Sequence, residues 1–353
     1  MRPHAHPQDT VDAVASSGLP VGKLPGQLLA RLIATYATSD PTVVVGPGLG
    51  GDAAAIDVGA TTLVVKSDPI TFASESPARY LVDVNANDLA CLGATPRWMM
   101  VTALLPEGTT EELVESHFRE LRDACLQRGI SLVGGHTEVT SGIRRPILVG
   151  VLIGEVERQR LLPPGGARVG DRLLLTKAIA IEGTALVARE LGDRLREVLD
   201  PEIVERAASF LSDPGISVAA EAIALLDAGG ITALHDPTEG GLATGVRELA
   251  LAAGCGATID RDAVPIMPET AAIADTLGLD PLGMLASGSL LAAADPDAVD
   301  RLVSIASKLG IRLTPIGEVT EGSRFVLRAD ELEEELPTFG SDETTRVLGT
   351  GTP

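Results

Sequence analysis

The chain has 353 residues, with 28 Lys and Arg against 49 Asp and Glu, so its formal net charge is −21. This charge excludes a protein that binds nucleic acid through a basic stripe, and it disfavours a surface that rests on anionic lipid. Hydrophobic residues make up 45% of the chain, which is too much for a disordered protein, and the length favours two domains.

The three cysteines, Cys91, Cys125 and Cys255, lie far apart, and their odd number argues against a disulfide framework. A reducing compartment is the simplest interpretation. The N-terminal segment lacks the charged-then-apolar order of a signal peptide, and the chain has no apolar run of about 18 residues. We therefore expect a cytoplasmic protein without a membrane span.

Helical and strand patterns are mixed in the first half of the chain. The apolar spacing predicts helices over 22–38, 77–92 and 109–128, and strands over 42–45, 53–58, 61–65, 98–104, 130–133 and 147–153. The third helix is expected to begin at a capping box formed by Thr109 and Glu112.

A segment rich in Pro and Gly, 161–170, predicts a domain boundary. The patterns after it predict helices over 184–191, 201–211, 218–228, 242–253, 268–277 and 296–309, and strands over 172–176, 232–234, 289–294 and 312–319. Because both halves mix helices and strands, the fold class is α/β or α+β. We expect a flexible tail at 1–21, domains at 22–160 and 168–330, and an acidic tail at 331–353 that forms a solvated face or docks to a partner.

Aspartates follow strand ends and interrupt an apolar helix. Asp52 comes directly after the glycine-rich segment 46–51, Asp68 follows a strand, and Asp88 lies in an otherwise apolar helix. Carboxylates that converge would suit Mg²⁺, which prefers hard oxygen ligands, although each could instead be a cap or surface residue. The segment 46–51 could approach a phosphate or form a hairpin, and it matches neither a dinucleotide fingerprint nor a P-loop.

Two further glycine-rich motifs occupy strand ends. The segment 133–138 follows a buried-looking strand, where His136 could be a base, a ligand or a turn residue. The segment 235–242 leads from a strand into a helix, so Gly240 and Gly241 would present free N–H groups to an anion. Asp236 could hold a metal there, or simply form the turn.

Taken in chain order, five motifs resemble one superfamily of ATP-using enzymes. They are Gly-Gly-Asp-Ala-Ala from Gly50, Ser-Asp-Pro-Ile from Ser67, Asn-Asp-Leu-Ala from Asn87, Gly-Gly-His-Thr from Gly134, and Asp-Pro-Thr-Glu-Gly-Gly from Asp236. The superfamily contains aminoimidazole ribonucleotide (AIR) synthetase, selenophosphate synthetase, thiamine-monophosphate kinase and the hydrogenase-maturation protein HypE. The resemblance spans about 22–319, and 22–25, 236–241 and 277–281 look most similar to the HypE branch.

This resemblance implies a two-domain PurM-like fold that dimerises by pairing N-terminal sheets and holds ATP and Mg²⁺ between an α/β domain and an α+β domain. It implies metal ligands at Asp52, Asp68, Asp88 and Asp236. It implies nucleotide- or phosphate-binding positions at Lys66, Gly134, Gly135, His136, Thr137, Thr238, Gly240 and Gly241. It assigns no catalytic residue.

Two departures from HypE bear on the activity that the resemblance implies. HypE ends in a cysteine that carries a carbamoyl group, whereas no cysteine follows Cys255 here, and Glu239 replaces an Arg. We interpret the chain as a homodimeric HypE-like enzyme that phosphorylates an amide or carbonyl oxygen of an unassigned substrate. A small-molecule kinase and a non-catalytic nucleotide-binding scaffold remain as alternatives.

Overall fold

The computed structural model describes residues 24, 26–47, 53–70, 77–330 and 332–348. Residues up to Ala37 form a unit of their own, whose described helix is α1 (Gly26–Tyr36). The second unit, from Thr38 onward, contains both sheets and the other described helices.

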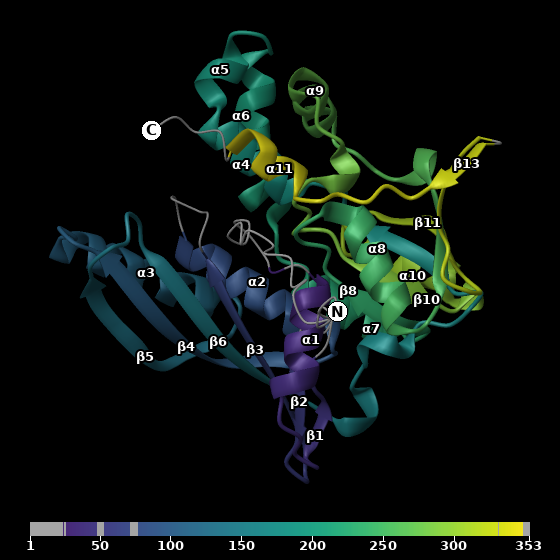
Figure 1. The fold of residues 1–353 in the computed structure, drawn as a ribbon, viewed down its shortest axis with the longest axis horizontal. Coiled ribbons are helices and arrows are strands. Elements are labelled where there is room, and N and C mark those ends of the chain that lie inside the picture. The colour runs from purple at the N-terminus through teal and green to yellow at the C-terminus, as the bar shows by residue number, and fades with distance from the viewer. Residues whose placement is uncertain (1–23, 25, 48–52, 71–76, 331, 349–353) are drawn as a thin grey trace, which may run out of the picture. The chain divides into compact units, whose positions relative to one another are not determined.

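A six-stranded sheet builds the first half of the second unit (Figure 1). Its strands, in spatial order, are β1 (Val43–Val45), β2 (Ala54–Asp57), β3 (Thr62–Ile70), β6 (Ile147–Val156), β4 (Thr95–Pro106) and β5 (Ser131–Thr140). The β4–β5 pair is parallel and the other neighbouring pairs are antiparallel. The order places β5 at one edge of the sheet, with its residues exposed.

Two helices, α2 (Pro77–Cys91) and α3 (Glu111–Gln127), pack against each other and against this sheet. Proline opens α2, where its missing N–H donor costs nothing. Residues of β6 alternate between buried and half-buried, which is expected of a strand with one well-covered face. Helix α2 is buried along almost its whole length, because it also contacts the second half of the chain.

A seven-stranded mixed sheet forms the second half. Its strands, in spatial order, are β13 (Leu332–Glu335), β12 (Phe325–Ala329), β9 (Gly256–Asp260), β11 (Leu313–Thr320), β7 (Arg172–Thr176), β10 (Leu291–Ala294) and β8 (Ile231–His235). Its helices are α4 (Ile181–Glu190), α5 (Gly192–Arg196), α6 (Pro201–Ser209), α7 (Ala219–Ala228), α8 (Gly241–Ala252), α9 (Pro268–Leu277), α10 (Val299–Lys308) and α11 (Glu343–Leu348).

The inner strands of the second sheet are buried on both faces. Alternate residues of a strand point to opposite faces, so Leu173 and Leu175 of β7 join the core under α8, whereas Leu174 joins the core under α7 and α10. Ala90 and Cys91 of α2 belong to the second of these cores. Helix α2 therefore connects the two halves through shared apolar packing.

The predicted fold class is confirmed, and the structure corrects three details. The N-cap of α3 is Thr110, whose side chain accepts a hydrogen bond from the Leu113 N–H, and not Thr109. Strand β5 is longer than predicted and exposed. The carboxylates of Asp342 and Glu343, expected in a solvated face, are buried.

Among the described residues no single helix has the length and apolar character to cross a membrane. One bent pair of helical segments, Pro201–Ser209 with Leu211–Ala228, meets the criteria for a membrane span by length and composition alone.

Candidate active site

A lysine ammonium joins two of the aspartates that were predicted to bind metal. Lys66 and Asp68 lie two residues apart on β3, and Asp88 lies on α2, which packs against that strand. The Lys66 Nζ is 3.2 Å from Asp68 Oδ2 and 2.8 Å from Asp88 Oδ2. Asp88 is only 3% exposed, and the ammonium offsets the cost of burying its carboxylate.

Asp236 reaches the same helix from the second half of the chain. It follows β8 directly and is 1% exposed. Cys91 donates a hydrogen bond from its Sγ to Asp236 Oδ1, with the two atoms 3.6 Å apart. Because Cys91 lies three residues after Asp88, their Cβ atoms are separated by about 5–6 Å on the helix. The structure therefore brings Asp236 within reach of the Lys66 cluster.

The oxygen ligands of these aspartates fit Mg²⁺ in their chemistry. The described part of the chain nevertheless contains no group of three or more His, Cys, Asp or Glu side chains arranged around one point. The Lys66 ammonium is the cation between Asp68 and Asp88, so a metal ion at that point would replace it. Asp52, the fourth predicted ligand, lies outside the described residues.

The Gly-Gly-His-Thr motif, 134–137, does not meet this cluster within one chain. It was predicted at the end of a buried strand, but it lies inside the exposed edge strand β5. Three strand spacings separate β5 from β3, which corresponds to about 14 Å. His136 Nε2 lies 3.1 Å from Glu138 Oε2, and both side chains are exposed. The motif residues instead line a cavity of about 430 Å³ beneath α3.

Gly135 has a structural reason to be glycine that does not involve a phosphate. Its φ is +148°, and a Cβ atom at this position would lie 1.9 Å from the carbonyl oxygen of Val101 on β4. No other residue fits so close to the neighbouring strand. His117, which also lines the cavity, is buried, and neither of its ring nitrogens has a hydrogen-bond partner among the described residues.

The turn that begins α8 contains two glycines in the left-handed conformation. Gly240 has a φ of +78° and Gly241 a φ of +66°, where a Cβ atom would lie 2.4 Å from the Leu282 carbonyl oxygen. The sequence predicts that their N–H groups are free, but in the structure both N–H groups donate hydrogen bonds. Gly240 donates to Asp342 Oδ2 at 2.8 Å, and Gly241 donates to the Thr238 carbonyl oxygen at 3.1 Å.

A buried carboxyl beside this turn was not predicted. Glu182 lies in the first turn of α4 and accepts a hydrogen bond from the side chain of Ser287. Burial raises the pKa of Glu182 to about 7, and the negative charges of Asp342, Glu239 and Asp236 also raise it. A carboxyl with this pKa can hold or release a proton near neutral pH, as acid–base groups do. The sequence offered no signal for it, because its acidic neighbours come from two segments that are distant from Glu182 in the sequence.

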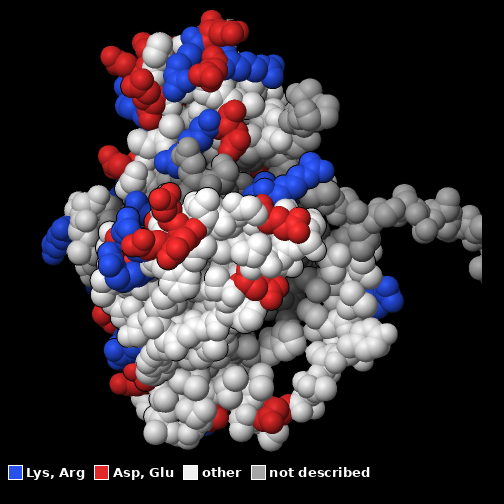
Figure 2. All heavy atoms as spheres, turned by 90° about the vertical axis from the view of Figure 1, so that its left-hand side faces the viewer, with Lys and Arg blue, Asp and Glu red and all other residues white. Residues whose placement is uncertain are grey.

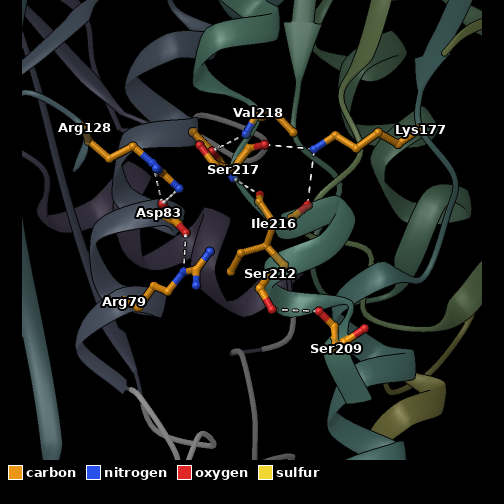
Figure 3. Close-up of polar contacts among 11 residues, drawn as sticks. Arg79, Asp83, Arg128, Lys177, Ser209, Ser212, Ile216, Ser217 and Val218 are labelled. Atoms are coloured by element: carbon orange, nitrogen blue, oxygen red, sulfur yellow. Dashed lines mark hydrogen bonds and ion pairs between the residues drawn. The ribbon is translucent and has the colours of Figure 1, made fainter. Parts of the chain in front are cut away.

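A polar clamp fixes α2 against the loop 215–218. Asn87, next to Asp88, donates from Nδ2 to the Ile216 carbonyl oxygen at 2.9 Å and accepts at Oδ1 from the Val218 N–H at 2.8 Å. Lys177 Nζ donates to two carbonyl oxygens of the same loop, at 3.2 and 2.9 Å (Figure 3). These contacts hold Asp88 in a defined position relative to the second half.

Comparisons with known proteins agree with this architecture. The model of the AIR synthase related protein N-terminal domain matches residues 50–156, and the model of the C-terminal domain matches residues 168–330. The carbamoyl dehydratase HypE of Cupriavidus necator is 31% identical over 263 residues, which are 72% of this chain and 71% of that protein.

Solved structures show the same fold. The crystal structure of HypE from Escherichia coli superposes with a TM-score of 0.71 at 23% identity and covers 91% of this chain and 99% of its own. A structure of HypE in complex with ATP gives a TM-score of 0.66 at 22% identity and covers 89% of this chain and 95% of its own. The chain therefore belongs to the AIR synthase related family, in which it is similar to the HypE proteins.

Proposed function

We propose that the chain is an enzyme that binds ATP with Mg²⁺ and phosphorylates an amide or carbonyl oxygen, as a step in the maturation of a hydrogenase or another protein. The observation that carries this proposal is the cluster of Lys66, Asp68 and Asp88, which Asp236 approaches from the other half of the chain. Relatives named carbamoyl dehydratase and the ATP complex of HypE support an ATP-dependent dehydration.

The roles of the residues follow from their charges. Asp68, Asp88 and Asp236, with Asp52, would hold Mg²⁺, which supplies charge neutralisation for the phosphates when it is bound. Lys66, released from the carboxylates, would turn its ammonium to the phosphates. The turn 238–241 would present backbone N–H donors at the N-terminus of α8.

The chemical step that we propose makes a poor leaving group into a good one. The substrate oxygen attacks the γ-phosphorus of ATP, and the bond between that phosphorus and the departing oxygen of ADP breaks. The phosphorylated oxygen can then leave as phosphate, which removes the elements of water from a carboxamide when two protons are also lost. The protein mainly positions the reactants and stabilises charge, which is typical of phosphoryl transfer.

We also propose that the chain forms a homodimer through the β5 edge of its first sheet. Leu132, Val133 and Val139 on this edge are exposed, as are Trp98 and Met100 on the neighbouring strand β4. Figure 2 looks onto this side of the molecule and shows a broad area without Lys, Arg, Asp or Glu. Such an edge would pair with other chains if it were left open. In the dimer, the motif 134–137 would reach the nucleotide of the second copy.

The Asp88→Asn substitution tests the proposed site. It keeps the shape of the side chain but removes the charge that pairs with Lys66, so we expect binding of ATP in the presence of Mg²⁺ to weaken at least about tenfold. Calorimetric titration measures this. The matched control is Asp193→Asn on α5, because the carboxylate of Asp193 is fully exposed.

The products of ATP separate the proposal from its alternatives. Release of ADP and phosphate with an amide-bearing substrate supports the proposal. A phosphorylated small molecule that persists would identify a kinase, and binding of ATP without turnover would identify a scaffold. If neither the unchanged chain nor the control binds ATP, the proposed function is wrong.

A further inference from the structure

The segment 336–348, which we call the C-terminal strap, lies against the turn that leads into α8. It leaves β13, and its last part, α11, packs against α4 and next to the segment Pro281–Gly283 (Figure 1). The ring of Phe339 lies so close to Gly283 that a Cβ atom there would be 2.6 Å from it. Leu336 is fully buried, and Val347 packs against the apolar core. The strap is thus part of the folded structure.

A carboxylate of the strap accepts a hydrogen bond from the N–H group at the beginning of α8. Asp342 Oδ2 accepts a hydrogen bond from the Gly240 N–H at 2.8 Å. Its Oδ1 accepts from the N–H groups of Leu285, at 3.2 Å, and Thr344, at 2.8 Å. Two of these donors, the N–H groups of Gly240 and Leu285, lie outside the strap and would stay in place without it. Backbone donors around one anion at the N-terminus of a 12-residue helix form the kind of site that binds a phosphate oxygen.

The strap has a second attachment that does not involve this turn. Glu343 Oε2 accepts a hydrogen bond from the Asp280 N–H at 3.0 Å, and Arg346 pairs with the same carboxylate. Thr344 Oγ1 accepts from the Leu285 N–H at 3.1 Å. The strap can therefore be loosened at Glu343 without any change at Gly240, which allows the two contacts to be tested separately.

Burial opposes the negative charge of Asp342. Burial raises the pKa of Asp342 in spite of the hydrogen bonds from Gly240, Thr344 and Leu285, which lower it. The nearby acids Glu182, Glu239 and Asp236 add negative charge to the same region. Keeping the Asp342 carboxylate charged beside α8 therefore costs free energy, which favours its replacement there by another anion.

We propose that the C-terminal strap is autoinhibitory: Asp342 occupies the Gly240 N–H that a nucleotide phosphate would use, and the strap must leave α8 before the phosphate binds. This inference rests on the proposed function, because it takes the turn 238–241 as part of the phosphate site. One N–H donor cannot serve the carboxylate and the phosphate together, so the two anions compete.

The test compares ATP binding, in the presence of Mg²⁺, to four forms of the full chain by calorimetric titration. Asp342→Asn removes the competing charge and should bind ATP about threefold to tenfold more tightly than the unchanged chain. Glu343→Gln loosens the strap and should give a smaller gain. Glu335→Gln, on the exposed strand β13, makes the same change in net charge and should bind as the unchanged chain does.

A second measurement follows the strap itself. Because Arg346 lies within α11, trypsin should cut after it faster when ATP and Mg²⁺ are present, if the nucleotide displaces the strap. Equal or weaker binding by Asp342→Asn, with its thermal unfolding unchanged, would overturn the inference and leave the proposed function intact. If Asp342→Asn does not fold, the affinity of Glu343→Gln and the trypsin rate decide the matter. If no form binds ATP, the proposed function fails, and the inference fails with it.

Discussion

At the level of single residues, Lys66 shows how an acidic chain can be suited to a polyanion. A net charge of −21 excludes a broad basic surface, but it does not exclude one ammonium held between two carboxylates. In the function that we propose, the same carboxylates would receive a metal ion, and the released ammonium would add to the positive charge near a phosphate. A site of this kind needs few basic residues, because one lysine on β3 already lies between the carboxylates of β3 and α2.

The Glu182→Gln substitution tests the buried carboxyl at this scale. The pKa of Glu182 is about 7 in the folded chain and near 4.5 in the unfolded chain, so the folded state binds the proton more tightly. Its contribution to stability is therefore present below pH 4.5 and is lost as the pH rises from there to 7. The variant does not titrate, so relative to the unchanged chain it should gain about 2 kcal/mol of unfolding free energy between pH 5 and pH 8.

Urea unfolding at the two pH values, without added metal, measures this gain. Glu197→Gln serves as the control, because Glu197 is exposed on the surface and should leave the pH dependence unchanged. A Glu182→Gln variant whose stability follows that of the unchanged chain at both pH values would show that the carboxyl does not titrate in this range.

At the level of elements, α2 determines how the candidate site is assembled. Its buried polar side chains include four near its middle and end, each with a different partner. Asn85 Oδ1 accepts from the Asp68 N–H at 3.2 Å, Asn87 holds the loop 215–218, Asp88 pairs with Lys66, and Cys91 contacts Asp236. The helix is packed from both halves of the chain, so these polar groups cannot reach water and must be paired within the protein.

The Asn87→Ala substitution tests this element. It leaves the Ile216 carbonyl and the Val218 N–H buried without their partner, which should lower the free energy of unfolding by about 2–4 kcal/mol. Gln127→Ala, which removes an exposed amide near the end of α3, should change it by no more than about 0.5 kcal/mol. Equal stabilities of the two variants in urea would contradict the clamp.

The sequence predicted the bounds of α2 well, but it could not identify the residues that pair with the buried polar side chains of this helix. An apolar helix with an aspartate in it already required a partner for Asp88, and Pro77 marked its beginning. Strand β5 was harder, because an apolar run does not reveal whether a strand lies at the centre or the edge of a sheet. The strap was missed for a related reason: its acids fit a solvated face, and only the tertiary structure brings Asp342 to Gly240. Whether Asp68, Asp88 and Asp236 bind metal stays a prediction.

At the level of the whole molecule, charge and apolar surface act in opposite directions on the dimer that we propose. Two chains together carry a formal charge of −42, twice the −21 of each, so their association is opposed by repulsion at long range. The β5 edge contributes one acidic residue, Glu138, and several exposed apolar side chains. Salt screens the repulsion but not the apolar contact, so a dimer through this edge should become tighter as the ionic strength rises.

The Val133→Lys substitution separates this edge from the rest of the surface. Val133 is 55% exposed on β5, and a lysine there would place a charge in the contact, so we expect the variant to be a monomer at about 10 μM in light-scattering measurements. Val198→Lys makes the same change at a residue that is 67% exposed in the second half, and it should remain a dimer. Lysine pairing with the acidic surface of a second copy would work against this result at low salt, so the comparison belongs at 0.15 M salt or above, where such pairing is largely screened. If both variants are dimers there, the contact lies elsewhere, and the motif 134–137 then has no route to a second nucleotide.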